Sequence, residues 1–362
     1  MAKKIKKIRV AVIGCGERGA LHLAMAAAAP EAKLVACCDA DRDRARAAGK
    51  AYKIRAYTDV QKMLRRRLFR RRIRAVHLCL PHDMHASVAG YCLTRGVHVL
   101  TEKPLGLDQA TAEQVVHYAA LSERVCGVFL PYRESVPAER VRQILASGKL
   151  GRILSVRSVL SWAPAESYYA AAEWRGTWER AGGGILMDRA VHTLDLVHSL
   201  VGSEVANVSC AMANRHHIGV PVEDSAEGLV VYKNGVRYAF YCMNTSGADI
   251  PIEIRLTCEA GEVVMDYDTA KVRYRDGGEE TYTAPEGHGG RPACYDGQVS
   301  RFYRACRGEG AIGVSAASTL SLHRLVFSVY DAARAQGIQL VGQESAAAAP
   351  VPVEKKTWRR WI

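Results

Sequence analysis

Residues 8–19 read IRVAVIGCGERG, and this stretch decides the fold of the first part of the chain. A short apolar run ends at Gly14-Cys-Gly16-Glu-Arg-Gly19 and an alanine-rich segment follows, so the pattern predicts a strand, a turn and a helix. Gly14 permits the tight turn, Gly16 lets the backbone approach a pyrophosphate, and Gly19 lets the helix pack against the strand. The amino end of the helix attracts the phosphate charge. The pattern therefore predicts dinucleotide binding, and the alternative is a glycine-rich turn that binds nothing.

A carboxylate follows at the spacing that a dinucleotide site needs. Asp39 ends the second apolar run, twenty residues after Gly19. Its carboxylate can accept hydrogen bonds from a ribose diol and would repel a 2′-phosphate, which favours NAD over NADP. Arg42 and Arg44 lie close to Asp39 in the sequence and would favour a 2′-phosphate. NADP therefore stays the alternative cofactor.

Apolar runs and helical stretches alternate through the first third of the chain. The helical stretches 40–52 and 109–121 are rich in alanine, arginine and glutamine. Strands that alternate with helices form a parallel sheet through right-handed crossovers. The runs that we expect to be strands are 9–13, 34–38, 75–80, 97–101 and 125–130.

The pattern changes after about residue 150, where strand signals follow one another directly. Asn234-Gly235 lies between two of these runs and is a strong hairpin signal. A helix is expected at 184–201 and a final one at 316–336. This half therefore reads as an antiparallel sheet with helices. Its expected strands are 153–160, 205–212, 225–233, 236–243, 252–258, 262–267 and 271–275.

Length and composition describe an ordinary folded protein. The 362 residues suggest two domains, and 49% hydrophobic with 24% charged residues argue against a disordered or fibrous chain. No apolar run approaches the ~20 residues that span a bilayer. The start of the chain lacks the long apolar stretch of a signal peptide, so we expect a cytoplasmic protein. The eleven cysteines include no CxxC pair, which argues against a zinc ribbon and favours small buried side chains in a reducing compartment.

The net charge of +13 is concentrated in one stretch. Residues 62–74 read KMLRRRLFRRRIR and hold eight cations with no acid, and removing them leaves +5. Two interpretations stay open, a solvated helix face or a docking site for an acidic partner or polyanion. The sequence contains no helix-turn-helix, zinc-finger or RNA-binding signature, so a nucleic-acid partner is not expected.

A lysine lies at the carboxyl end of the fourth apolar run. Ligands of open parallel sheets bind at the carboxyl ends of the strands, which is where Glu102-Lys103-Pro104 falls. The Lys103 ammonium could bind a substrate hydroxyl and stabilise a developing alkoxide, while Pro104 fixes the turn. The alternative is a surface turn.

The stretch GGGILMDRAVHTLD, residues 182–195, places polar side chains at helical spacing. On a regular helix Asp188, His192 and Asp195 form one stripe, opposite a core face of Leu186, Ala190, Leu194, Val197 and Val201. Asp188 can hold or polarise His192 at i, i+4, and a histidine is the natural base for a hydroxyl proton near neutral pH. A surface ion pair and a metal site are the alternatives.

These motifs together resemble the Gfo/Idh/MocA oxidoreductases over residues 7–340. The match rests on VIGCGERG, CLPHDMHASVA, GVHVLTEKP, GGGILMDRAVHTLD and a late glycine-rich to helical segment. The resemblance implies an α/β fold, in which an N-terminal Rossmann domain is followed by a C-terminal α/β domain built on an open, mostly antiparallel sheet. We place the Rossmann domain at 1–131, the substrate-binding and oligomerisation domain at 132–342, and a mobile tail at 343–362.

The resemblance also implies roles for particular residues. Lys103 is similar to the active-site lysine of the family, and Asp188 and His192 to its acid–histidine pair, with His192 as the proton acceptor and no metal. Leu80 and Ala190 depart from the frequent residues, and the arginine run replaces the usual acids before the fourth strand. The implied cofactor contacts are Gly14, Gly16, Glu17, Arg18, Gly19, Asp39, Leu80, Pro81, His85, Glu102 and Lys103. The implied substrate contacts are Arg133, Trp174, Arg175, Asp188 and His192.

Three functions are compatible with these residues. The first is NAD-dependent oxidation or reduction at a secondary hydroxyl of a sugar, sugar derivative or cyclitol, in a homodimer or homotetramer without a membrane partner. The second is redox-neutral glycoside cleavage, in which bound NAD oxidises the sugar transiently. The third is a regulator that senses NAD and sugar without turnover. The motifs do not name the sugar.

Overall fold

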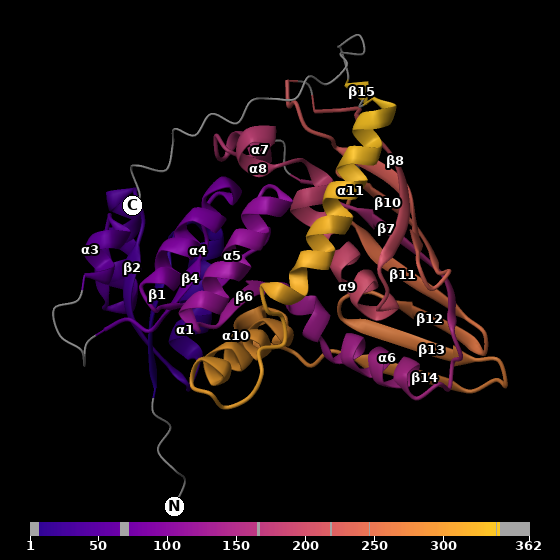
Figure 1. The fold of residues 1–362 in the computed structure, drawn as a ribbon, viewed down its shortest axis with the longest axis horizontal. Coiled ribbons are helices and arrows are strands. Elements are labelled where there is room, and N and C mark those ends of the chain that lie inside the picture. The colour runs from indigo at the N-terminus through magenta and orange to yellow at the C-terminus, as the bar shows by residue number, and fades with distance from the viewer. Residues whose placement is uncertain are drawn as a thin grey trace, which may run out of the picture. The chain divides into compact units, whose positions relative to one another are not determined.

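The computed structural model describes residues 7–65, 72–164, 167–217, 219–245, 247–337 and 339–340. These residues form two units (Figure 1). The first unit contains residues 7–130 and 295–320, and the second contains residues 131–294 and 321–340. Segment 295–320 thus belongs to the first unit, whereas the sequence assigned it to the second. The expected tail 343–362 and the centre of the arginine run, 66–71, lie outside the described residues.

The first unit is built on a six-stranded parallel sheet with the order β3-β2-β1-β4-β5-β6. The expected alternation of strands and helices is confirmed, and the sequence missed only the three-residue β3. The strands are β1 (Ile8–Ile13), β2 (Ala32–Cys38), β3 (Arg55–Tyr57), β4 (Ala75–Leu78), β5 (His98–Glu102) and β6 (Cys126–Phe129).

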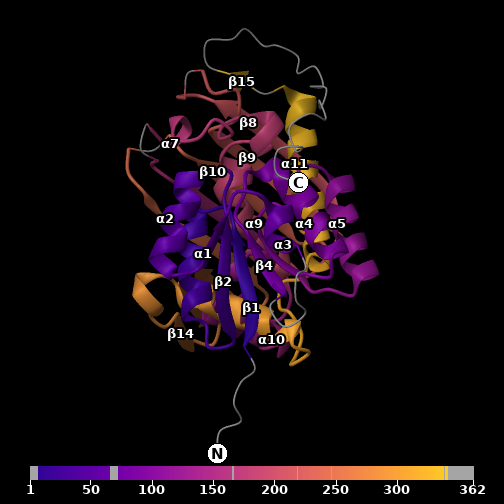
Figure 2. The same cartoon turned by 90° about the vertical axis from the view of Figure 1, so that its left-hand side faces the viewer.

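Helices cover both faces of this sheet. Figure 2 shows α1 and α2 on one side of β1 and β2, with α4 and α5 on the other. The helix α10 packs with α1, because its Val299 and Phe302 belong to the same core cluster as Met25 and Ala26 of α1. That packing explains why a late segment belongs to the first unit. The helices are α1 (Glu17–Ala28), α2 (Arg42–Tyr52), α3 (Val60–Leu64), α4 (His85–Thr94), α5 (Gln109–Ser122) and α10 (Ala293–Cys306), with short 3-10 turns at His82–Met84 and Ala317–Thr319.

The second unit is built on a nine-stranded sheet with the order β14-β13-β12-β11-β7-β10-β9-β8-β15. Most neighbours are antiparallel, and the β7–β10 and β8–β15 pairs are parallel. The expected hairpin at Asn234-Gly235 joins β9 to β10. The strands are β7 (Ile153–Ser161), β8 (Val205–Asn214), β9 (Ser225–Tyr232), β10 (Arg237–Met243), β11 (Ile250–Cys258), β12 (Gly261–Met265), β13 (Thr269–Tyr274), β14 (Glu279–Thr283) and β15 (Gln339–Leu340).

Helices pack on one face of this second sheet. Figure 1 shows α9 and α11 on the same side of it. The helix α11 buries Leu325, Val329 and Tyr330, as its apolar spacing predicts. The elements are η3 (Pro131–Glu134), α6 (Val136–Ala146), α7 (Ser167–Ala170), α8 (Trp178–Ala181), the π-helix η4 (Leu186–Ala190), α9 (Val191–Val201), η5 (His288–Gly290) and α11 (Leu320–Gln336).

Two further findings bear on the sequence predictions. All eleven cysteines lie in the described residues, are buried or half-buried, and form no disulfide. Within the same residues, no helix combines the length and the apolar character that a membrane span requires.

Candidate active site

The glycine-rich loop has the geometry that its spacing predicts. Gly14 has a φ of +89°, and a Cβ there would lie 2.0 Å from the carbonyl oxygen of Cys79. A Cβ on Gly19 would lie 2.0 Å from the carbonyl oxygen of Gly14. By contrast, a Cβ on Gly16, the residue that precedes α1, would have no atom within 4 Å. The loop is therefore tightly packed at Gly14 and Gly19, and the space next to Gly16 is open to an approaching phosphate. Glu17 and Arg18 are exposed in the first helical turn.

Asp39 holds this loop from the end of β2. Its side chain is buried, and Oδ2 accepts a hydrogen bond from the Cys15 N–H at 2.7 Å. The other oxygen, Oδ1, accepts from the Asp41 N–H at 2.9 Å and lies 3.7 Å from the Arg44 Nε. Asp39 thus orders the turn in addition to the ribose contact expected from the sequence.

His85 ties together the loops that follow β4 and β5. Its fully buried ring places Nε2 2.9 Å from the Leu80 carbonyl and Nδ1 2.7 Å from the Pro104 carbonyl. Burial lowers the pKa of His85, although both carbonyls favour the protonated ring. The side chain of Leu80 is buried as well. His85 therefore positions the turns of Pro81 and Lys103, and the cofactor contact that the resemblance implied for it stays a prediction.

A buried chain of hydrogen bonds ends at Glu102, next to Lys103. Tyr303 Oη lies 2.9 Å from His77 Nε2, and His77 Nδ1 lies 2.9 Å from His22 Nδ1. His22 Nε2 in turn lies 3.2 Å from Glu102 Oε1. Two proton arrangements satisfy every contact. In the first, Tyr303 donates to His77, His77 to His22, and His22 to the carboxylate. In the second, a protonated His22 donates to both Glu102 and His77, and His77 donates to Tyr303. Burial lowers the pKa of His77 well below its usual range, so His77 is neutral in both.

Glu102 stays ionised at the end of this chain. Burial alone would raise the pKa of Glu102, but the hydrogen bond and the charge of His22, followed by the charges of Arg18 and Lys103, lower it to about 2. Lys103 follows directly at the carboxyl end of β5 and is 7% exposed. The sequence reasoning missed His22, His77 and Tyr303. A histidine inside the apolar run Ala75–Leu80 was the signal that could have found the chain.

The candidate catalytic helix of the second unit begins as a π-helix. Val191 donates its N–H to the Leu186 carbonyl, five residues back, so residues 186–190 do not follow the regular helical angles assumed from the sequence. The Asp188 carboxylate accepts a hydrogen bond from the Tyr168 hydroxyl. Burial and the charge of Asp188 raise the pKa of Tyr168, so its phenol stays protonated and donates.

His192 lies in the first turn of α9, half-buried beside an aromatic ring. The Tyr132 ring meets it edge-on, with centroids 5.6 Å apart. Tyr132 in turn stacks on Tyr267 at 3.8 Å, and the Tyr267 hydroxyl lies 2.8 Å from the Thr193 Oγ1. These rings restrict the imidazole to a defined orientation.

Asp195 does not join the expected polar stripe. It is 1% exposed and forms an ion pair with Arg133, whose Nε lies 3.0 Å from Oδ2. Burial opposes the charge of Arg133, but Asp195 raises the pKa of that guanidinium. The pair spans 62 residues, so no local pattern shows it. Arg133, expected to bind substrate, therefore holds α9. The described part of the chain contains no cluster of three metal-binding side chains.

Trp174 and Arg175 gather close to Asp188. The Arg175 guanidinium lies over the Tyr168 ring at 4.4 Å and over the Trp174 ring at 6.0 Å. Because Tyr168 donates to Asp188, these side chains form one cluster with the candidate acid. The structure thus brings Asp188, Trp174 and Arg175 together and assigns Arg133 to a different contact.

Comparison with known proteins agrees with this architecture. Residues 8–130 match a family model described as oxidoreductase family, NAD-binding Rossmann fold, and residues 138–264 match the GFO/IDH/MocA C-terminal domain. The chain belongs to the GFO/IDH/MocA oxidoreductase family. A UDP-kanosamine synthase oxidoreductase subunit, named as putative, from Amycolatopsis mediterranei is 31% identical, covering 63% of this chain and 66% of the relative. D-apiose dehydrogenase from Paraburkholderia graminis is 30% identical, covering 67% and 62%.

A solved structure shares the whole fold. The WlbA dehydrogenase from Bordetella pertussis, in complex with NADH and UDP-GlcNAcA, superposes with a TM-score of 0.79 at 24% identity, covering 91% of this chain and 98% of that one. At this identity the likeness shows the fold alone. The chain spans about half to two thirds of the length of the curated relatives that it matches.

In this family member the buried carboxylate of Glu223 holds the start of the candidate catalytic helix. Glu223 Oε2 accepts from the Gly184 N–H at 2.9 Å, and Oε1 accepts from the Leu186 N–H at 3.1 Å and the Tyr330 hydroxyl at 2.9 Å. A Cβ on Gly183 would lie 1.9 Å from Tyr330 Oη, so the glycines at 183 and 184 are required by close contact. Burial raises the pKa of Glu223 to about 7, although all three donors oppose the shift.

The hydrogen-bond chain predicts the effect of removing one hydroxyl. Tyr303→Phe leaves the His77 Nε2 buried without its hydrogen-bond partner, which costs about 1–3 kcal/mol. We expect urea denaturation to show this loss in the free energy of unfolding. The control is Tyr52→Phe, whose hydroxyl has no hydrogen bond in the described residues, and we expect a change within about 0.5 kcal/mol. Equal stability of the two variants would contradict the chain.

The Glu223 contacts predict a pH dependence of stability. The folded state holds a proton on Glu223 up to a pKa of about 7, whereas the unfolded chain releases it near 4.5. The folded state therefore binds more protons in this window, and stability falls as pH rises through it. Glu223→Gln removes that part of the slope. Urea midpoints at several pH values, with Glu227→Gln as the exposed control, measure it, and identical slopes in all three proteins would refute the shift.

Proposed function

We propose that this protein is an NAD-dependent dehydrogenase that oxidises or reduces a secondary hydroxyl of a sugar, a sugar derivative or a cyclitol. The observation that carries the proposal is the glycine-rich loop held by Asp39, where Gly16 faces open space. Its support from relatives is the sugar chemistry in the names of D-apiose dehydrogenase and the UDP-kanosamine synthase subunit. NAD, bound by this loop, supplies the hydride acceptor.

The side chains of this protein supply the proton chemistry. His192 accepts the hydroxyl proton, because a neutral imidazole is an effective base near pH 7 and the Tyr132 ring fixes its orientation. Lys103 stabilises the oxygen as negative charge develops on it, and Glu102 holds the backbone from which Lys103 projects. Asp188, with its hydrogen bond from Tyr168, is the partner carboxylate in the acid–histidine pair.

The cofactor preference follows from charge. Asp39 presents a buried carboxylate that disfavours a 2′-phosphate, while the Arg44 Nε lies 3.7 Å from it and offsets part of that repulsion. We therefore propose NAD as the preferred cofactor, with NADP used less well.

Substrate contacts are proposed for the cluster beside Asp188. Aromatic faces such as Trp174 pack on the C–H surface of a sugar ring, and Arg175 could bind a carboxylate or phosphate on the substrate. The ion pair of Arg133 with Asp195 favours a positioning role for Arg133 instead.

Activity assays test the proposed roles. We expect reduced-cofactor absorbance when the protein meets NAD and a few related compounds from a panel of sugars, sugar acids, inositols and glycosides. Lys103→Ala and His192→Ala each lower turnover by at least about 10²-fold and leave NAD affinity within about threefold of wild type. The exposed Lys149→Ala is the control.

Other outcomes would redirect the proposal. Full activity of either variant contradicts the assigned role of that residue. Aglycone release from a glycoside without added cofactor would indicate the redox-neutral reaction. Tightly bound NAD with silence across the panel would indicate a regulator.

We also propose that the protein assembles as a homodimer or homotetramer through the open face of the second sheet. Val159 on β7 and Leu229 on β9 are 39% and 38% exposed, and Ala239 and Tyr241 on β10 lie between them on that face. Large apolar side chains that share one exposed sheet face favour an interface.

A single charge tests this interface. Leu229→Glu places a carboxylate beside Ala239 on that face, which also carries Arg157 and Glu227, and we expect sedimentation velocity to show dissociation toward the monomer. Leu121→Glu is the matched control, because Leu121 is 70% exposed on α5 of the first unit. A wild-type monomer, or equal dissociation of both variants, would overturn the proposal.

A further inference from the structure

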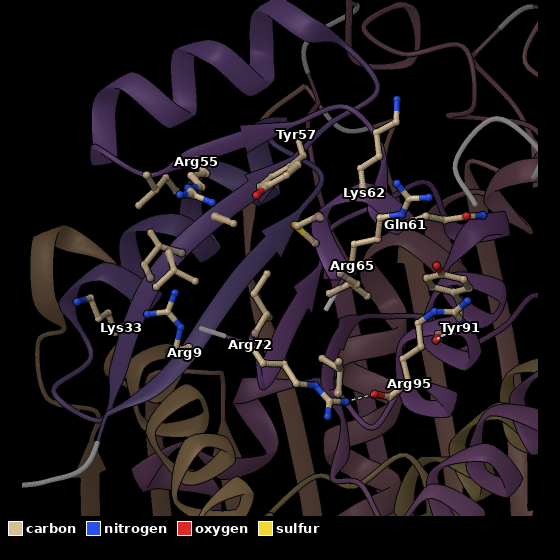
Figure 3. Close-up of a pocket in the computed structure, with 18 of the residues that line it drawn as sticks. Arg9, Lys33, Arg55, Tyr57, Gln61, Lys62, Arg65, Arg72, Tyr91 and Arg95 are labelled. Atoms are coloured by element: carbon tan, nitrogen blue, oxygen red, sulfur yellow. Dashed lines mark hydrogen bonds between the residues drawn. The ribbon is translucent and has the colours of Figure 1, made fainter. Parts of the chain in front are cut away.

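The first unit contains a cleft that the proposed dehydrogenase reaction does not use. The crossover helix α3 has five residues and spans about 7.5 Å, whereas the seven-residue β2 spans about 23 Å. A cavity of about 1360 Å³ lies beside it, lined by residues of β1, β2, β3, α3 and the last turn of α4 (Figure 3). Among the described residues, this short helix covers only part of the sheet face.

This cleft is separate from the glycine-rich loop. Arg9 is the second residue of β1, Lys33 the second of β2, and Arg55 the first of β3. Gly14 and Asp39 follow the carboxyl ends of the same strands. Arg9 and Lys33 lie near the amino ends, whereas Arg55 pairs with Ala36 in the carboxyl half of β2. The described lining contains no residue of the glycine-rich loop and not Asp39, so the cleft is distinct from that loop.

The described lining is strongly cationic. It contains no Asp or Glu, and six of its cations form no ion pair with any described residue. These six, which we call the cationic set, are Arg9, Lys33, Lys53, Arg55, Lys62 and Arg65. In addition, the Nε of Arg9 is buried without a hydrogen-bond partner in the described chain. Unpaired cations around a concave surface repel one another and produce a strong positive potential there. A bound anion would reduce that repulsion.

The arrangement favours an elongated anion over a compact one. Figure 3 shows Arg9, Lys33 and Arg55 toward one side of the cleft and Lys62 and Arg65 toward the other, so the charges do not surround a single point. The cavity is also far larger than one phosphate group. A phosphate chain carries a charge on every unit, whereas a nucleic acid adds a base, and an acidic peptide a backbone, for every charge. Arg and Lys are common phosphate ligands in proteins.

We propose that this cleft binds a linear chain of phosphates, either inorganic polyphosphate or the phosphate chain of a nucleoside polyphosphate. The cationic set neutralises the chain, and the short α3 provides the space for it. The binding is independent of the dehydrogenase reaction, so the proposed function and this site stand or fall separately.

Calorimetric titration of the full chain tests the site. Saturating NAD first occupies the glycine-rich loop, and the salt is held at about 0.15 M to screen weak surface attraction. The probes are inorganic tripolyphosphate, a nucleoside triphosphate, orthophosphate, hexaglutamate and a short single-stranded oligonucleotide. We expect both phosphate chains to bind at least tenfold more tightly than orthophosphate. Equal affinities of the two chains assign the site to the phosphates alone, and a tighter nucleoside triphosphate assigns it to a nucleotide.

Matched charge reversals locate the binding. Lys33→Glu with Arg55→Glu removes two members of the cationic set, and we expect tripolyphosphate affinity to fall at least tenfold. Arg46→Glu with Lys50→Glu makes the same change of net charge on the exposed part of α2, and its affinity should stay within twofold of wild type. Should the first pair fail to fold, Lys62→Gln with Arg65→Gln tests the other side of the cleft. Unchanged NAD binding verifies folding.

Three results would overturn the proposal. The first is no tripolyphosphate binding to the wild-type protein. The second is an equal loss in the α2 control, which would indicate nonspecific attraction. The third is tighter binding of hexaglutamate or the oligonucleotide than of both phosphate chains.

Discussion

The position of Lys103 depends on the buried hydrogen-bond chain from Tyr303 through His77 and His22 to Glu102. Its four members come from α10, β4, α1 and β5, so one set of contacts joins the helix after the glycine-rich loop to the strand that ends at the lysine. Because the pKa of Glu102 is lowered to about 2, this carboxylate stays ionised and accepts the hydrogen bond from His22 over the whole physiological range. A buried polar network of this kind must be fully satisfied, since each missing donor leaves a desolvated acceptor.

In the second unit, the buried carboxylate of Glu223 likewise holds the backbone next to candidate catalytic residues. There the carboxylate accepts directly from two backbone N–H groups and from Tyr330, and so it fixes the segment that leads into the π-helix. The pKa values of the two carboxyl groups differ because their surroundings differ in charge. Positive charges near Glu102, including those of Arg18 and Lys103, lower its pKa to about 2. At Glu223 only hydrogen bonds oppose the effect of burial, so its pKa rises to about 7. Glu102 thus fixes the backbone next to Lys103, and Glu223 fixes the segment before Asp188 from a position more than 35 residues away in sequence.

The sequence predicted those elements that depend on interactions between residues close together in the chain. The strands with long apolar runs, the Asn234-Gly235 hairpin and the dinucleotide loop were readable, because periodicity and turn chemistry act over a few residues. The strand β14 was not, since its alternating EETYT has little apolar signal, and β3 is too short. The placement of α10 depends on Phe302 meeting Val10 across the sheet core, which no window of sequence contains. The π-helix was missed because DRAVH reads as ordinary helix.

The site shows the same division between local and distant contacts. The spacing of Asp188 and His192 predicts them as an acid–histidine pair, but the aromatic side chains that contact them, Tyr168 and Tyr132, come from segments 20 and 60 residues away. The distribution of positive charge also depends on contacts between distant segments. In the sequence the cations are concentrated in one arginine-rich stretch, yet only Lys62 and Arg65 of the cationic set belong to that stretch. Arg9 and Lys33 join them because β1 and β2 pair in parallel and set these two residues side by side, and β3 adds Arg55 beside Ala36 of β2. Lys53 lies just before β3. The sheet thus brings together cations that are scattered along the chain, and the proposed phosphate site depends on that arrangement.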